Sequence, residues 1–137
     1  MAEVWVGGRA KGLPPAVVRR AVRTVLRRER READVSVTFL GPTVMRRLNL
    51  EFRGRDRPTD VLAFPLQAGR HLAGDIYICP AVAQLQARQL GIRPRDELLR
   101  LVVHGTLHVL GYDHPEDASR EASAMWRRQE RHLEALA

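Results

Sequence analysis

The sequence is poor in aromatic residues and has no long apolar run. Aromatic side chains are only 5% of the 137 residues, so aliphatic side chains must fill the interior. No apolar stretch approaches the roughly 20 residues that cross a bilayer. The N-terminus has no basic segment followed by an apolar stretch, as a signal peptide would have. We therefore expect a cytoplasmic protein with no membrane segment, folded as one domain over residues 1–137.

Cysteine is nearly absent, and Cys79 is the only one. A single cysteine excludes an intrachain disulfide and a zinc site rich in thiolates. Cys79 ends the apolar, strand-like run at residues 75–79. We therefore interpret it as a buried small hydrophobic residue and not as a nucleophile.

Lysine is also scarce, although the chain is strongly basic. The net charge is +7, and 22 of the 23 basic residues are arginine, with Lys11 the exception. Such a charge favours a polyanionic partner, nucleic acid above all. The arginine bias alone also fits a GC-rich coding sequence, so both interpretations stay open.

The apolar pattern predicts an α+β domain with a small mixed sheet of about four strands and about five helices. Residues 98–103 are apolar nearly all round, which predicts a central, buried helix. Pro65 places its strand at an edge of the sheet or ends it. The expected strands are 3–7, 34–40, 60–66 and 72–79, the last two paired as a hairpin. The expected helices are 14–31, 43–52, 80–90, 95–110 and 117–135.

The helix expected over residues 14–31 has an apolar face and a basic face. The basic face could lie along a phosphate backbone, or it could simply be solvated, as charged helix faces usually are. Its arginines are Arg19, Arg20, Arg23, Arg27, Arg28, Arg30 and Arg31.

The clearest motif combines three histidines at the end of the central helix. His104 and His108 are four residues apart, so both imidazoles leave the same face of the helix. Gly111 is expected to end the helix, because glycine tolerates a positive φ there. The chain can then turn back and bring His114 to the same ion. Three nitrogen ligands leave a fourth position open, which is typical of catalytic zinc; nickel, copper and iron also accept imidazole.

The same spacing matches the metzincin peptidase motif H-E-x-x-H-x-x-G-x-x-H, with one departure. Gly105 stands where that motif has its glutamate. A peptidase of this kind needs the carboxylate to deprotonate water, so peptide hydrolysis is disfavoured while the ligand geometry is kept. The two remaining histidines, His71 and His132, lack such neighbours, and we expect them at the surface.

Polar residues elsewhere could complete the site. Arg53, Arg55 and Arg57 alternate along an expected extended loop, which would form a cationic ridge suited to phosphate; a solvated loop is the alternative. Asp113 and Asp117 could orient an imidazole ligand. Asp117 could equally cap the last helix.

Three blocks together give the chain a family resemblance: HGTLHVLGYDH at residues 104–114, LNLEFRGRDRPTDVLAFP at residues 48–65, and GDIYI at residues 74–78. In this order they resemble the bacterial YbeY family, metal-dependent single-strand endoribonucleases that mature ribosomal RNA. Phe52 stands where tyrosine is common in the family, and Arg55 where lysine is common; both changes are mild.

The resemblance implies an α+β fold and one zinc ion held by His104, His108 and His114. It also implies that Arg53 is the functional arginine, so that Arg53 and His104 are the expected catalytic residues. The implied partners are single-stranded RNA, the 3′ end of 16S rRNA and the 30S subunit, with ribosomal proteins or an assembly GTPase as further candidates. Cytoplasmic residence and a role in ribosome quality control follow from the same resemblance.

The expected reaction is hydrolysis of a phosphodiester in unpaired RNA. The metal would polarise a phosphate oxygen or activate water, and Arg53 would stabilise the charge that develops on the phosphate. The sequence does not name the general base: zinc-bound hydroxide, Asp113, and the RNA 2′-hydroxyl as nucleophile all stay open. Two rival functions remain: a metal-dependent hydrolase of another bond, and a non-catalytic zinc-containing ribosome assembly factor.

Overall fold

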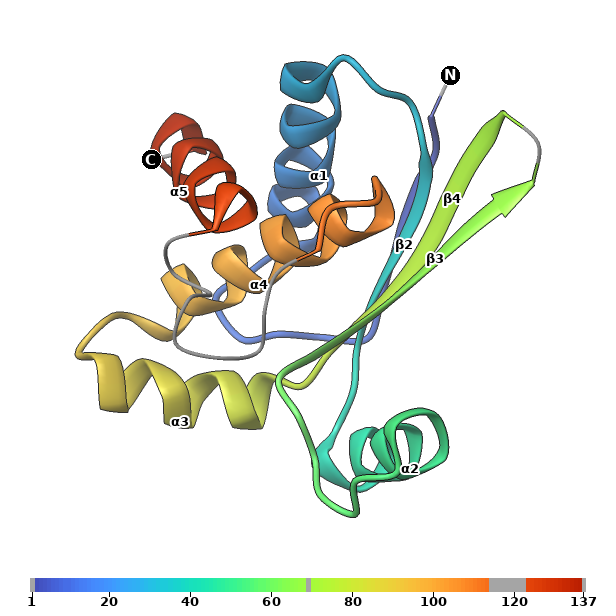
Figure 1. Cartoon of the computed structure of the whole chain (residues 1–137). Helices are drawn as coiled ribbons and strands as arrows, with labels where there is room; N and C mark the ends of the chain where they lie inside the picture. The colour runs from blue at the N-terminus through green and yellow to red at the C-terminus, as the bar shows by residue number, and fades with distance from the viewer. Residues whose placement is uncertain (1, 69, 114–122, 137) are drawn as a thin grey trace.

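The computed structural model describes residues 2–68, 70–113 and 123–136 of the chain. Helices and strands alternate along most of this part, and Figure 1 shows α4 running between α1 and α3, with α5 beside α1. The strands are β1 (Val4–Gly7), β2 (Asp34–Phe39), β3 (Val61–Ala68) and β4 (His71–Ile78). The helices are α1 (Pro15–Glu29), α2 (Pro42–Arg53), α3 (Pro80–Leu90), α4 (Pro94–Val109) and α5 (Ala124–Leu136).

The strands form a mixed sheet in the order β1-β2-β4-β3. β1 and β4 both run parallel to β2, whereas β3 pairs with β4 as an antiparallel hairpin. Alternate residues of β2 point into the core: Val35, Val37 and Phe39 are buried. The predicted hairpin and the edge position of the strand that contains Pro65 are both confirmed.

Helix α4 lies at the centre of the fold, as the sequence predicts. It packs against β3 and β4 on one side and against α1, α3 and α5 around the rest of its surface. Asp96 and Glu97 stand in its first turn, where negative charge is favoured by the helix dipole. The helix ends before Gly111, which has a φ of 99°. Glycine adopts this left-handed conformation without strain, so the predicted helix stop is confirmed.

Two glycines let α4 approach the sheet closely. A Cβ built on Gly105 would lie 2.7 Å from the side chain of Ile76, and one built on Gly74 would lie 2.5 Å from Val109. Because carbon atoms do not pack at such distances, both positions need a residue without a side chain. The GDIYI block in β4 and the block that begins at His104 in α4 therefore meet at this contact.

His132 is buried, with 3% of its surface exposed, so the prediction that it lies at the surface is wrong. Its Nε2 lies 2.7 Å from a carboxylate oxygen of Glu29, and its Nδ1 accepts a hydrogen bond from Arg28. Tyr112 and Arg128 also donate to Glu29, at 2.8 and 3.2 Å. The partners are about a hundred residues away in α1, which is why the sequence around His132 gives no sign of them.

Two other sequence predictions for single residues are confirmed. His71 is exposed and pairs with Asp34, as expected of a surface residue. Cys79 is fully buried, as predicted. Within the described residues, no helix is both long and apolar enough to cross a membrane.

Candidate active site

His104 and His108 face each other from successive turns of α4. Their Nε2 atoms are 3.1 Å apart, and their ring centroids are separated by 4.7 Å. His104 is 6% exposed, whereas His108 is partly exposed. The four-residue spacing thus brings two imidazole nitrogens to one point at the edge of the core.

Gln129 of α5 sets the tautomer of His104. The Nδ1 atom of His104 lies 2.8 Å from Oε1 of Gln129, and both side chains are buried. An amide oxygen only accepts hydrogen bonds, so Nδ1 must carry the hydrogen. In a neutral imidazole the other nitrogen, Nε2, then carries an unprotonated lone pair, and this is the nitrogen that lies 3.1 Å from Nε2 of His108.

The histidine pair fits a transition metal ion. Two nitrogens bound about 2.05 Å from one tetrahedral zinc ion would lie about 3.3 Å apart, close to the observed 3.1 Å. The hydrogen bond from His104 to Gln129 is the kind of outer contact that holds a metal-binding imidazole in place. Residue 114 lies outside the described residues, and within them no group of three histidine, cysteine or acidic side chains could hold a metal.

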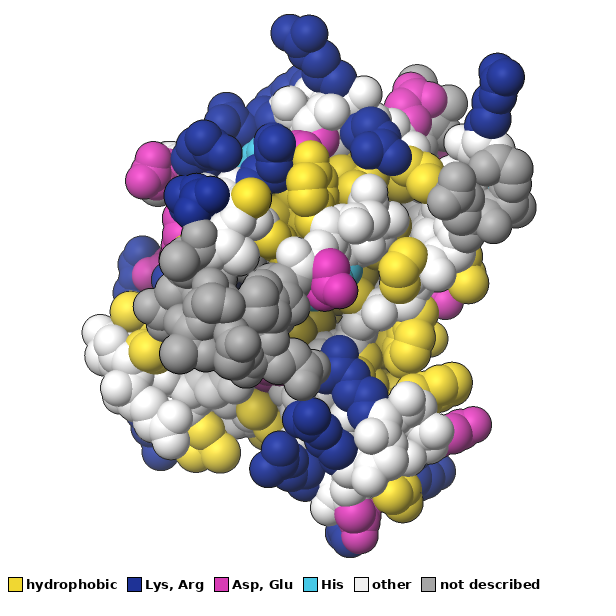
Figure 2. Space-filling view, in the orientation of Figure 1, with side chains coloured by type: hydrophobic (Ala, Val, Ile, Leu, Met, Phe, Trp, Pro, Cys, Tyr) yellow, Lys and Arg dark blue, Asp and Glu magenta, His cyan; other side chains and the backbone are white. Residues whose placement is uncertain are grey.

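The histidines open into a cavity of about 440 Å³, which we call the histidine cavity. Figure 2 shows basic side chains gathered on the lower part of this face, over the segment that links α2 to β3. The described residues that line the cavity include Arg53, Arg55, Asp60, His104, His108 and Asp113. The structure therefore brings the predicted arginine, both described histidines and Asp113 to one cavity.

The arginines do not form the extended ridge that the sequence suggested. Arg53 is the last residue of α2, and Gly54 follows it in the left-handed conformation with a φ of 69°. Only Arg53 and Arg55 are among the residues lining the histidine cavity, so the prediction of a three-arginine ridge is wrong. The helix end turns the chain, and this turn removes the alternation on which the ridge depended.

The loop after α2 is tied back to that helix. The buried Asn49 donates from Nδ2 to the carbonyl oxygen of Arg57 at 2.8 Å. Arg46 forms two hydrogen bonds with Asp56, and they hold the pKa of this carboxyl below its usual range. The Arg46–Asp56 pair is exposed, so it contributes little to stability. The buried Asn49 contact is the stronger constraint on the loop that carries Arg55.

Comparisons with known proteins identify the family of the chain. The family described as Endoribonuclease YbeY matches residues 13–137. The chain belongs to the YbeY family.

Its relatives are similar over most of their length. The protein named Endoribonuclease YbeY from Thermotoga maritima is 37% identical over 112 residues, covering 82% of this chain and 73% of that protein. The protein of the same name from Desulfitobacterium hafniense is 43% identical over 134 residues, covering 90% and 82%. A solution structure of a Thermotoga maritima protein aligns with a TM-score of 0.70 and 32% identity, covering 97% of this chain and 88% of that one.

Three polar residues at the site of this YbeY family member were missed by sequence reasoning. Gln129 had no role assigned within the expected last helix, Asp60 lay inside a recognised block without a role, and Gln86 gave no signal. Asp60 and Gln86 both line the histidine cavity. Asp60 accepts hydrogen bonds from the Val61 backbone and the Thr59 hydroxyl, which fix its carboxylate at the start of β3.

Gly105 explains why the peptidase glutamate has no place in this protein. Its missing side chain would point at Ile76 of β4 and not into the histidine cavity. A glutamate there could not be accommodated without moving the helix from the sheet. His114 and Asp117, the third expected ligand and a possible orienting carboxylate, lie outside the described residues.

Proposed function

We propose that the protein is a single-strand-specific, metal-dependent endoribonuclease that uses one zinc ion and trims the 3′ end of 16S rRNA in late maturation of the small subunit. One observation carries the proposal: His104, His108 and two arginines line the same cavity. The chain's relatives are named endoribonucleases, which supports RNA as the substrate. Histidine nitrogens suit a transition metal, and arginines suit phosphate.

His104, His108 and His114 would hold the ion in the proposed site. Zinc, when bound, supplies a Lewis acid that polarises phosphate and lowers the pKa of water. Gln129 keeps the lone pair of His104 Nε2 directed toward His108. Nickel, copper and iron remain alternatives, which elemental analysis of the purified protein distinguishes.

Arg53 and Arg55 would act on the phosphate itself. Attack on phosphorus increases the negative charge on the non-bridging oxygens, and a guanidinium placed there stabilises that charge. The bond from phosphorus to the leaving oxygen breaks, and the leaving oxygen takes up a proton. A 2′-hydroxyl nucleophile leaves a 2′,3′-cyclic phosphate and water leaves a linear one, so analysis of the product ends decides between them.

Replacing His108 with alanine tests the metal. We expect His108→Ala to lose bound zinc and to lower cleavage of single-stranded RNA by at least a hundredfold, because one imidazole ligand is removed. His71→Ala is the matched control, since His71 is an exposed histidine outside the cavity. Unchanged cleavage by a metal-free His108→Ala protein would remove the metal from the mechanism.

Replacing Arg53 with alanine tests the phosphate contact. We expect Arg53→Ala to keep its zinc and to lower kcat by about a hundredfold, the usual effect of losing one charge-stabilising donor. Arg57→Ala is the control, because Arg57 lies in the loop that directly follows Arg53 but does not line the cavity. Equal turnover in the two variants would show that the wrong arginine has been assigned.

The proposed role places the protein in the cytoplasm with the 30S subunit, and with ribosomal proteins or an assembly GTPase as further partners. Precursor 30S particles treated with the zinc-loaded protein should gain mature 16S 3′ ends. If the RNA stays intact while the protein binds the particle, the rival function of a non-catalytic assembly factor is supported instead. Cleavage of a peptide panel would support the other rival, a hydrolase of a different bond.

A further inference from the structure

A second cavity adjoins the histidine cavity and has no assigned role. It measures about 320 Å³ and lies between α3, α4 and α5; we call it the tryptophan cavity. Asp60, Gln86 and His104 line both cavities. One ligand could therefore place a group in the tryptophan cavity and a phosphate beside the histidines.

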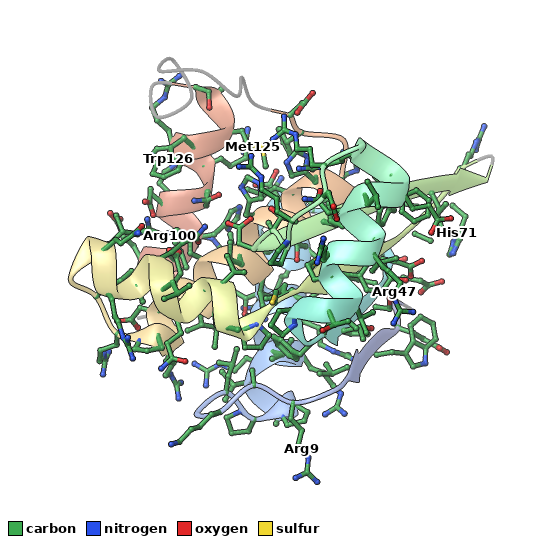
Figure 3. The ribbon with its side chains drawn as sticks, turned by 90° about the horizontal axis from the view of Figure 1, so that it is seen from below. Arg9, Arg47, His71, Arg100, Met125 and Trp126 are labelled. Atoms are coloured by element: carbon green, nitrogen blue, oxygen red, sulfur yellow. The ribbon has the colours of Figure 1, made fainter. Side chains whose placement is uncertain are left out.

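The walls of the tryptophan cavity combine flat apolar surface with amide groups. Trp126 of α5 and Leu90 of α3 supply apolar surface, and Leu90 is 57% exposed. Gln86 and Gln89 add two carboxamides, each of which can donate and accept hydrogen bonds. Figure 3 shows Trp126, on α5, and Arg100, next to α3, on the same side of the molecule. This mixture suits a planar group with a polar edge.

The charges argue against a second phosphate in this cavity. Its one cation, among the described residues that line it, is Arg100, which lies 3.9 Å from Glu97 and 3.5 Å from Glu130. Asp60 adds another carboxylate to the lining. An anion would be repelled, whereas a neutral ligand with hydrogen-bonding groups would not be.

Arg100 also has a donor whose hydrogen bond is unsatisfied. Its Nε is buried and has no hydrogen-bond partner among the described residues. Its guanidinium carbon lies 5.7 Å from the centre of the Trp126 ring. Unpaired bases in RNA are commonly held by aromatic rings and arginine planes, with hydrogen bonds to their edges.

We propose that the tryptophan cavity binds one unpaired nucleobase of the RNA strand, next to the phosphate held in the histidine cavity. This inference rests on the proposed function, because it takes RNA as the ligand. It adds a physical reason for single-strand specificity: a base must leave its stack and its pairing partner to enter the cavity.

The test measures binding of labelled single-stranded RNA, with an abasic nucleotide moved through the strand one position at a time. We expect wild-type protein to bind about tenfold more weakly when one position lacks its base, since stacking on an aromatic ring contributes about that much. Gln89→Ala should reduce this difference to about threefold, because one hydrogen bond to the base is lost. Gln89 is exposed at the rim of the cavity, so the variant should fold normally.

Gln84→Ala is the matched control, because Gln84 is an exposed glutamine of α3 that does not line the cavity. It should keep the tenfold difference. Equal binding of intact and abasic strands by wild-type protein at every position would overturn the base site, as would equal effects of the two glutamine variants. RNA binding does not require cleavage, so the two proposals fail separately. Failure to cut RNA would overturn the proposed function, whereas the abasic-strand binding assay alone decides the base site.

Discussion

Gln129 is the residue through which α5 acts on the proposed metal site. Replacing it with leucine removes the Oε1 acceptor 2.8 Å from the buried Nδ1 of His104 and with it the contact that favours one tautomer of the imidazole. We expect Gln129→Leu to lower zinc affinity by about 10- to 100-fold, the usual effect of losing an outer partner of a metal ligand. Competition with a chelator of known affinity measures this directly.

Gln129→Glu is the conservative variant for this test. A carboxylate keeps an oxygen in place of Oε1, so zinc affinity should remain close to that of the wild type. A merely structural role would make both variants bind zinc equally, with their losses confined to thermal stability. That outcome would contradict the assignment of Gln129 as a positioning residue.

Single residues differ in how far the sequence could predict them. His104 and His108 were predictable because their partners lie within one turn of the same helix. Gln129 and His132 were not, since their partners are in α4 and α1, distant in the sequence. The sequence identified the arginines near the site but predicted an extended loop, which is wrong. The left-handed turn at Gly54 follows from where α2 ends, and the sequence pattern did not fix that position.

At the scale of elements, the contact between α4 and β4 positions the histidines. Gly105→Ala should lower the free energy of unfolding by about 1–2 kcal/mol, because the added methyl group meets the rigid, buried side chain of Ile76. This loss outweighs the better helix propensity of alanine, worth about 1 kcal/mol. Chemical denaturation measures the change. Gly41→Ala is the control, because a Cβ there meets nothing within 4 Å; equal stability of both variants would contradict close packing at Gly105.

The cluster around Glu29 joins α1, α5 and the end of α4, and it should make stability depend on pH. Burial opposes ionisation of Glu29, but hydrogen bonds from Tyr112 and His132 and the charge of Arg128 outweigh it and lower its pKa. A lowered pKa in the folded state means that this stabilisation is complete above the ordinary glutamate pKa of about 4.3. It is lost as the pH falls through the folded value.

Glu29→Gln should therefore be less stable than the wild type at neutral pH and should lose less stability on acidification. Denaturation curves between about pH 3 and pH 7 measure both effects. Glu134→Gln, at an exposed glutamate of α5, is the control and should follow the wild type. Parallel pH profiles for wild type and Glu29→Gln would show that the cluster does not favour the ionised carboxylate.

The elements themselves were largely predictable, and their relations were less so. Apolar periodicity and the prolines at helix starts gave the strands and the first four helices to within a few residues, and Gly111 ended α4 as expected. The last helix was predicted over residues 117–135, but α5 begins at Ala124 and Ser123 is not helical; residues 117–122 lie outside the described residues. The pairing of β2 with both β1 and β4 was not predictable, because parallel partners are joined by intervening helices and no short turn fixes their register. Both cavities depend on such long-range placement, because residues of α3 and α4 line each of them and α5 adds Trp126 and Gln129 to the second.

At the scale of the whole molecule, the sequence offers two sets of arginines that could contact RNA, one near the histidines and one on α1. Arg53 and Arg55 line the histidine cavity, whereas Arg19 and Arg20 are exposed on α1. Each phosphate contact with a single strand contributes about 0.7 to the slope of log affinity against log salt. Replacing Arg53 and Arg55 together with glutamine should therefore reduce that slope by about 1.4.

The double variant Arg19→Gln/Arg20→Gln removes the same charge from α1 and is the matched control. If the arginine face of α1 is solvated, the salt slope of this variant should equal that of the wild type. Long-range attraction to RNA falls slightly in both double variants, because both lose two positive charges. An equal reduction in the two double variants would show that the strand also runs along α1, outside the two cavities. An unchanged slope after loss of Arg53 and Arg55 would contradict the phosphate contact itself, because counterion release counts only the phosphates that the protein neutralises.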